Sequence, residues 1–146
     1  MASDEKSLGW LKPMLVQGWA SIAFWMMFGL LLEGLIGYKI PAYLEDAQRR
    51  ELFRLAHTHG TLLGLLLVIG ALCAKNFALE IVKAPRVALR LGVVLMPLGF
   101  FLSGIRHTET DPGLAIWLVP VAALLIIWAA IAFVLALLKF NDEKGQ

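Results

Sequence analysis

The stretch "PGLAIWLVPVAALLIIWAAIAFVLALL", from Pro112 to Leu138, contains no charged residue over about 27 positions. A helix needs roughly 20 apolar residues to cross the hydrocarbon core of a bilayer. No water is present there to bond the backbone, so a single spanning segment of this kind satisfies its own N–H and C=O groups as a helix. The stretch therefore predicts a transmembrane helix over residues 112–138.

Three further apolar runs have the same character. Pro13–Leu32 carries no charge, Leu55–Ala74 is uncharged apart from two histidines, and Val87–Ile105 contains Arg90 as its only charge. Each run is long enough to cross a membrane as a helix. The predicted spans cover residues 11–37, 52–74, 86–105 and 112–138.

The composition of the whole chain agrees with four spans. Of its 146 residues, 60% are hydrophobic and 16% are charged, with a mean hydropathy of +0.77. A water-soluble domain carries more charge than this. We expect an all-α polytopic membrane protein, with residues 1–146 forming one up-and-down four-transmembrane-helix bundle in a lipid bilayer. The sequence contains no nucleophile motif, phosphate loop or dinucleotide fingerprint, and no nucleic-acid partner is expected.

The connections give further expectations. The charged stretch "AYLEDAQRRELFRL", residues 42–55, is expected to continue into the second span as an extramembrane turn or two. Before the fourth span, Asp111 is expected to be an N-cap and Pro112 to occupy the first helical position.

The basic residues predict the orientation. Cytoplasmic connections of membrane proteins carry an excess of Lys and Arg. The two tails and the central connection share one side of a four-span protein and hold eight basic residues: Lys6, Lys12, Lys75, Lys83, Arg86, Arg90, Lys139 and Lys144. The other side holds five: Lys39, Arg49, Arg50, Arg54 and Arg106. We therefore expect both termini in the cytoplasm, in a bacterial cytoplasmic (inner) membrane.

Four ionisable residues are expected at one depth on the periplasmic side: Glu33, His57, His59 and His107. At about 1.5 Å of rise per residue, Glu33 lies about 7 Å below Tyr38, and His59 lies about 7 Å below Arg54. Ionisable groups inside a membrane are costly and mark functional sites by default. The matched depth therefore favours a His/Glu site.

Helical spacing separates the roles of these residues. Glu33 shares a face with Gly29 and Gly37, and His57 shares one with Gly60 and Gly64. Small residues let helices approach closely, so both faces should point into the bundle and bring Glu33 near His57.

His59 is rotated by about 200° from His57 around the helix and shares its face with leucines. The sequence leaves two interpretations open for each residue. Glu33, His57 and His107 either hold helices together through hydrogen bonds and ion pairs or take part in a metal site. Neutral imidazole is the commonest metal ligand in proteins. His59 is the best candidate ligand, because an imidazole gains nothing from leucine neighbours alone.

The stretch "FRLAHTHGTLLGLLLVIGAL", residues 53–72, resembles the helix of haem–copper oxidase catalytic subunits that supplies a low-spin haem ligand. The resemblance covers about 20 residues and implies that His59, which precedes Gly60, is an axial ligand. Four spans and three histidines do not make a complete oxidase. The second haem ligand would then be His107 or a histidine of another protomer, or the iron would be five-coordinate.

These observations favour a component of a redox or electron-transfer complex that binds haem b or copper on the periplasmic side. His59 and His107 are the expected cofactor ligands, and His57 and Glu33 are further candidates for the metal site. Two alternatives remain. One is a structural or accessory membrane subunit without a cofactor, in which the polar residues pack helices. The other is a small proton or metal-ion conduit that uses Glu33 and His57. Expected partners are other membrane subunits or further copies of the chain.

Overall fold

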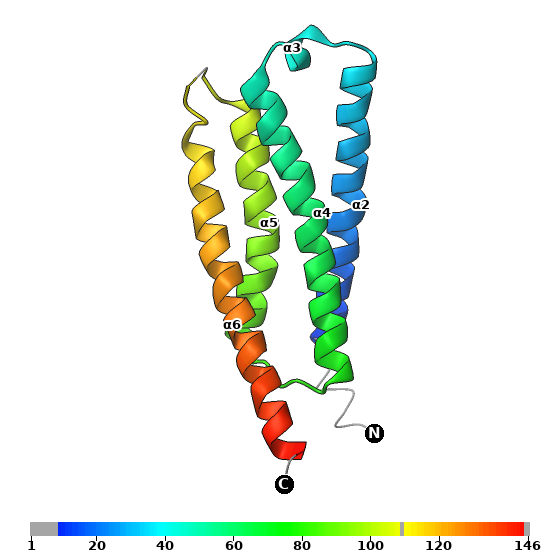
Figure 1. Ribbon diagram of the computed structural model, residues 1–146, viewed down its shortest axis with the longest axis vertical. Helices are drawn as coiled ribbons and strands as arrows, with labels where there is room; N and C mark the ends of the chain where they lie inside the picture. Colours follow the sequence, from blue (N-terminus) through cyan, green and yellow to red (C-terminus); the bar gives the residue numbers. More distant parts are fainter. Residues whose placement is uncertain (1–8, 109, 145–146) are drawn as a thin grey trace.

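The computed structural model describes residues 9–108 and 110–144, with side chains placed up to residue 139. Four long helices run up and down along the molecule (Figure 1). All four are long and apolar enough to cross a membrane, which confirms the predicted all-α four-span fold. The elements in chain order are α2 (Leu11–Gly37), α3 (Pro41–Leu44), α4 (Ala47–Asn76), α5 (Lys83–Ile105), η1 (Leu114–Trp117) and α6 (Leu118–Lys144).

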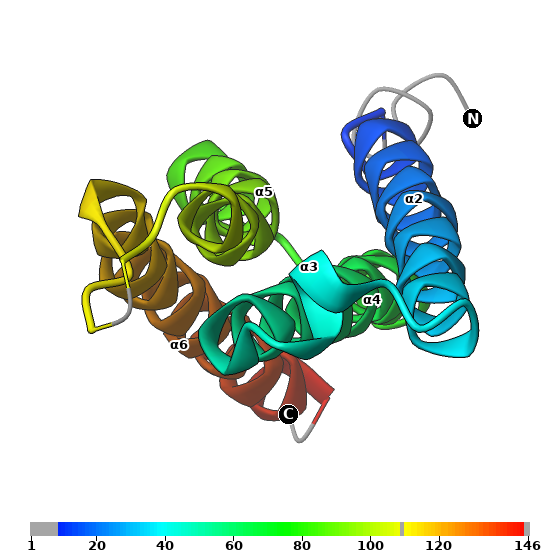
Figure 2. The same ribbon diagram turned by 90° about the horizontal axis from the view of Figure 1, so that it is seen from above.

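Helix α4 is the centre of the arrangement. It packs against α2 on one side and α5 on the other, and α6 packs mainly against α5, with the ring of Phe133 also lying beside Gly70 of α4. Seen from above, α2 and the first part of α6 lie at opposite edges of the molecule, and α6 then runs obliquely toward α4 (Figure 2). The outer faces of both edge helices are rich in exposed apolar side chains, as helices that contact lipid should be.

Glycines set the closest approaches between the helices. A Cβ at Gly18 of α2 would lie 2.8 Å from the carbonyl oxygen of Gly64 on α4. A Cβ at Gly92 of α5 would lie 3.1 Å from the carbonyl oxygen of Ala122 on α6. Helices in lipid associate by close packing of small residues, since apolar side chains gain little from leaving lipid for protein. These glycines therefore fix the register of the bundle.

An aromatic cluster joins three helices near α3. The ring of Phe101 on α5 lies 5.3 Å from Phe28 of α2 and 5.6 Å from Phe53 of α4, measured between ring centroids. Tyr43 of α3 stacks against Phe53 at 6.5 Å. Edge-to-face and offset rings at these distances attract one another. The cluster anchors the short helix α3 to the bundle.

Two expected helix starts differ from the structure. Helix α4 begins at Ala47, five residues before the predicted span, because Asp46 caps it by accepting a hydrogen bond from the backbone N–H of Arg49 at 2.8 Å. This confirms that the charged stretch continues as helix into the second span.

The expected N-cap at Asp111 is wrong. Its carboxylate instead accepts a hydrogen bond from the N–H of Gly113 at 2.8 Å. Gly113 has a positive φ of 77°, so the chain turns there and helical structure begins at Leu114, two residues after Pro112.

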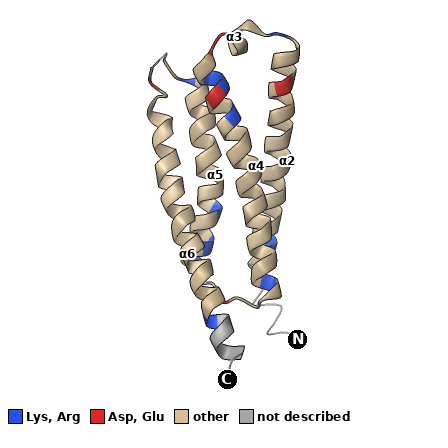
Figure 3. Cartoon of the chain, in the orientation of Figure 1, with Lys and Arg blue, Asp and Glu red and all other residues tan. Residues whose placement is uncertain are grey.

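Charged residues lie mainly toward the ends of the helices (Figure 3). The end near α3 carries acidic and basic residues together. The opposite half of α5 carries basic residues alone. The connection before α5 also holds the acidic Glu80, so the end opposite α3 is mainly but not wholly basic.

Candidate functional site

His57 is used in packing α4 against α2. Its Nδ1 lies 2.7 Å from the backbone carbonyl oxygen of Trp25, so Nδ1–H donates to that oxygen. The imidazole ring occupies the space that a side chain at Gly29 would fill. The predicted orientation of His57 into the bundle is therefore correct, and its nearest partners belong to the backbone of α2.

Glu33 does not meet His57. His57 contacts Gly29 and Gly60 contacts Trp25, so the antiparallel register places Glu33 level with Phe53, about one turn closer to α3. Glu33 is exposed, and a Cβ at the neighbouring position Gly37 would contact nothing within 4 Å. No direct hydrogen bond joins Glu33 to His57 among the described residues, because His57 faces Gly29 and Glu33 lies about one turn closer to α3.

His59 lies between α4 and α5 and is half-buried. Its Nδ1 is 2.8 Å from the carbonyl oxygen of Leu55, one turn earlier in the same helix. Its ring packs on Phe100 of α5 with 5.0 Å between ring centroids. Because Nδ1–H donates to the carbonyl, the neutral imidazole carries its free lone pair on Nε2. The neighbouring Leu62 and Leu66 are exposed on the surface of the bundle.

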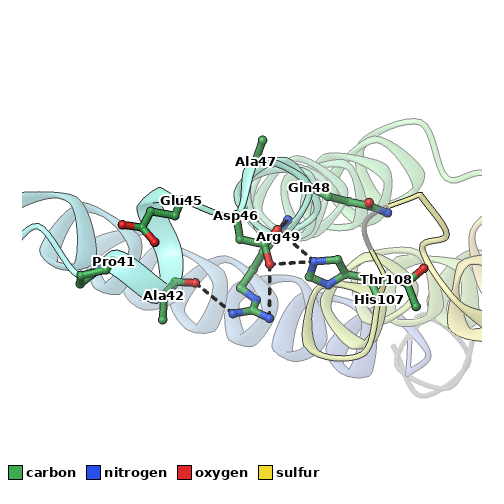
Figure 4. A pocket seen from close by; sticks show the side chains of 9 residues that line it. All are labelled: Pro41, Ala42, Glu45, Asp46, Ala47, Gln48, Arg49, His107 and Thr108. Atoms are coloured by element: carbon green, nitrogen blue, oxygen red, sulfur yellow. Dashed lines mark hydrogen bonds and ion pairs between the residues drawn. The ribbon is translucent and has the colours of Figure 1, made fainter.

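His107 belongs to a different cluster, at the start of α4. Its Nε2 lies 3.0 Å and 2.9 Å from the two carboxylate oxygens of Asp46 (Figure 4). Arg49 lies on the same carboxylate at 3.4 Å and donates from Nε to the carbonyl oxygen of Gly104 at 3.2 Å. One carboxylate thus caps α4 and links it to the end of α5.

The Asp46 carboxylate is surrounded by groups that stabilise its negative charge. The hydrogen bond from the N–H of Arg49 holds the pKa of Asp46 below its ordinary value of 3.8, and His107 and the Arg49 guanidinium lower it further. The His107 side chain is only 5% exposed, and its Nδ1 is buried without a hydrogen-bond partner among the residues that the structure describes. The Nε2–H of His107 therefore donates to the Asp46 carboxylate, and this is the contact that fixes the ring.

The cluster borders a polar cavity of about 780 Å³ at the α3 end of the bundle. Figure 4 shows Asp46, Arg49 and His107 on one part of its wall, with Pro41 and Glu45 beside them. Asp46 was not among the site residues expected from the sequence. Its position directly before the helix "AQRRELF" was a usable signal, because Asp is a preferred N-cap residue.

The predicted ligands are not brought together. His107 contacts Asp46, and His59 lies thirteen residues further along α4, which corresponds to about 20 Å along the helix axis. Within residues 9–108 and 110–139, no three His, Cys, Asp or Glu residues are grouped so that they could hold a metal ion. His59 and His107 of one chain are therefore too far apart to ligate the same haem iron or metal ion.

Comparisons with known proteins add no family to this description: no protein-family model, curated protein or solved structure matches the chain.

Proposed function

We propose that this protein is a membrane component of a redox or electron-transfer complex, in which His59 ligates a haem b or a copper ion. The observation that carries the proposal is the hydrogen bond from Nδ1 of His59 to the carbonyl oxygen of Leu55. Metal-binding histidines almost always donate their other ring N–H to a carbonyl or carboxylate, which fixes the tautomer and aims the free nitrogen. His59 has this geometry.

The surroundings of His59 suit a porphyrin edge better than a hydrated ion. Phe100 packs on the imidazole, and the exposed side chains of Leu62 and Leu66 belong to the same helix face. His107 is engaged with Asp46 at another depth. The second axial ligand would therefore come from a second copy of the chain or from another membrane subunit, or the iron would be five-coordinate.

A structural or accessory subunit is the second candidate function. It is favoured by the contacts of the other two histidines, since His57 bonds the backbone of α2 and His107 bonds the cap of α4. A proton or metal-ion conduit has less support. It would need Glu33 and His57 as successive members of a relay, and Glu33 lies exposed about one turn away.

We place the protein in a bacterial inner membrane with both termini in the cytoplasm. Support for this orientation comes from the excess of basic residues on the side of the termini. In this orientation, the end of the bundle that carries α3 and the Asp46–His107 cluster faces the periplasm.

An optical spectrum of the detergent-purified protein, with elemental analysis, tests the proposal. A Soret band or a stoichiometric metal is expected in the unaltered protein. It should be lost in His59→Ala and kept in His57→Ala, because the second variant removes only contacts between α4 and α2. A colourless, metal-free protein would favour the accessory subunit. Full occupancy after loss of His59 would show that another residue is the ligand.

A further inference from the structure

A second cavity lies at the opposite end of the bundle, between the start of α2 and the start of α5. Its volume is about 200 Å³. Lys83, Arg86 and Arg90 contribute to its wall from α5. Their spacing places the three side chains on one face of the helix, over about two turns. The cavity therefore faces a row of positive charges.

Helix α2 holds two of these cations in position. Arg90 donates from Nε to the side-chain oxygen of Gln17 at 2.7 Å, and Gln17 donates back to the carbonyl oxygen of Arg90 at 2.7 Å. The guanidinium of Arg86 lies 4.5 Å above the ring of Trp10. A guanidinium on an aromatic face or on a side-chain amide keeps its full charge. Both contacts orient the cations without neutralising them.

The cations lack an acidic partner within the described chain. No ion pair joins any of the three to a carboxylate among residues 9–108 and 110–139. Arg90 lies seven residues inside α5, about 10 Å along the axis from Lys83, and is the only charge of an apolar run. A charge at that depth is costly unless an anion or water accompanies it. The cavity is thus suited to an anion that can enter from the membrane.

The remaining walls are apolar. Pro13, Met14 and Val87 line the cavity beside the Trp10 ring. A free inorganic anion gains nothing from such walls, whereas a lipid phosphate carries a glycerol and acyl chains that can cover them. Basic pockets between transmembrane helices on the cytoplasmic side are typical sites for anionic lipid headgroups.

We propose that this cavity binds the phosphate group of an anionic phospholipid from the leaflet on the side of the termini. Lys83, Arg86 and Arg90 contact the phosphate oxygens, and the apolar wall holds the start of an acyl chain. The site is separate from the His59 ligand site, because none of the residues that line the cavity contacts His59.

Native mass spectrometry of the full chain, released from mixed micelles with equal amounts of phosphatidylglycerol and phosphatidylcholine, tests the proposal. The unaltered protein should retain phosphatidylglycerol preferentially. Lys83→Gln combined with Arg86→Gln should weaken this retention about twenty-five-fold, because each cation near the phosphate contributes roughly a five-fold effect. This variant keeps the Gln17–Arg90 pair and therefore the contact between α2 and α5.

The matched control is Lys75→Gln combined with Lys139→Gln, which removes the same charge from the same side outside the cavity. It should retain phosphatidylglycerol as the unaltered protein does. Equal retention by the cavity variant and the control would overturn the site. Thermal stabilisation by inorganic phosphate equal to that by phosphatidylglycerol would overturn the assignment to a lipid.

Discussion

The ring of His57 fills the space left by the missing side chain of Gly29. One turn away the relationship is reversed, because the ring of Trp25 on α2 fills the space beside Gly60 on α4. Each helix thus offers one ring and one glycine to the other. The hydrogen bond from His57 to the Trp25 carbonyl oxygen closes this joint.

Gly29→Ala should destabilise the protein by about 1–3 kcal/mol, the usual cost of overpacking a filled contact. The added methyl group would overlap the His57 ring, and the ring cannot move without losing its bond to α2. Thermal unfolding in detergent measures the effect.

Gly34→Ala on the same helix is the control, because a Cβ there meets nothing within 4 Å. It should leave the unfolding temperature unchanged or raise it slightly, since Ala is the better helix former. An equal loss of stability in both variants would contradict the described joint.

Asp46 has two roles that substitutions can separate. Asn is as good an N-cap as Asp, so Asp46→Asn should keep the cap of α4 and lose only the carboxylate's contact with His107 and its ion pair with Arg49, at a cost of about 1 kcal/mol. Asp46→Ala should lose both and cost about 1 kcal/mol more. A double-mutant cycle with His107→Ala should show coupling for Asp46→Asn. Additive effects would contradict the contact.

The cluster also predicts a dependence on pH. The pKa of Asp46 is lowered in the folded protein, so its contribution to stability is present above the ordinary value of 3.8 and is lost as pH falls below it. Between about pH 5 and pH 3, the unfolding temperature should therefore fall more steeply for the unaltered protein than for Asp46→Asn. Parallel curves would show that Asp46 titrates alike in both states.

The orientation can be tested by cysteine labelling. In a chain carrying Cys73→Ser, we introduce Glu45→Cys near α3 or Glu80→Cys in the connection before α5, both at exposed positions. A membrane-impermeant maleimide added to intact bacterial spheroplasts should label only the first variant. Labelling of the second variant alone would invert the orientation proposed from the basic residues.

The four spans were predictable because each apolar run has the length that a bilayer requires. The start of α4 required more than hydropathy, since the Asp46 cap extends the helix into polar sequence. The start at Leu114 was missed because the local bond from Gly113 to Asp111 competes with the helix cap.

The site was predictable only in part. The angular positions of the residues around the helix correctly predicted that His57 points into the bundle and that His59 lies on another face. The depth of Glu33 in the membrane, counted from the end of its own span, did not match that of the histidines. The register between two helices depends on which glycines of both helices meet, and the sequence of one helix does not determine it. The Asp46–His107 contact joins residues 61 positions apart, so no spacing within one helix could have indicated it.

The attachment of α6 mainly to α5 has a consequence for biogenesis. Helices α2, α4 and α5 contact one another through three features: the rings of His57 and Trp25 packed on glycines, the aromatic cluster, and the Gln17–Arg90 pair. None of these contacts includes α6. During synthesis, these three helices leave the ribosome first and can assemble in the bilayer before α6 is inserted. A nascent chain arrested before Leu114 should therefore already resist protease at the α2–α4 contact, and insertion of α6 would be a separate, later step.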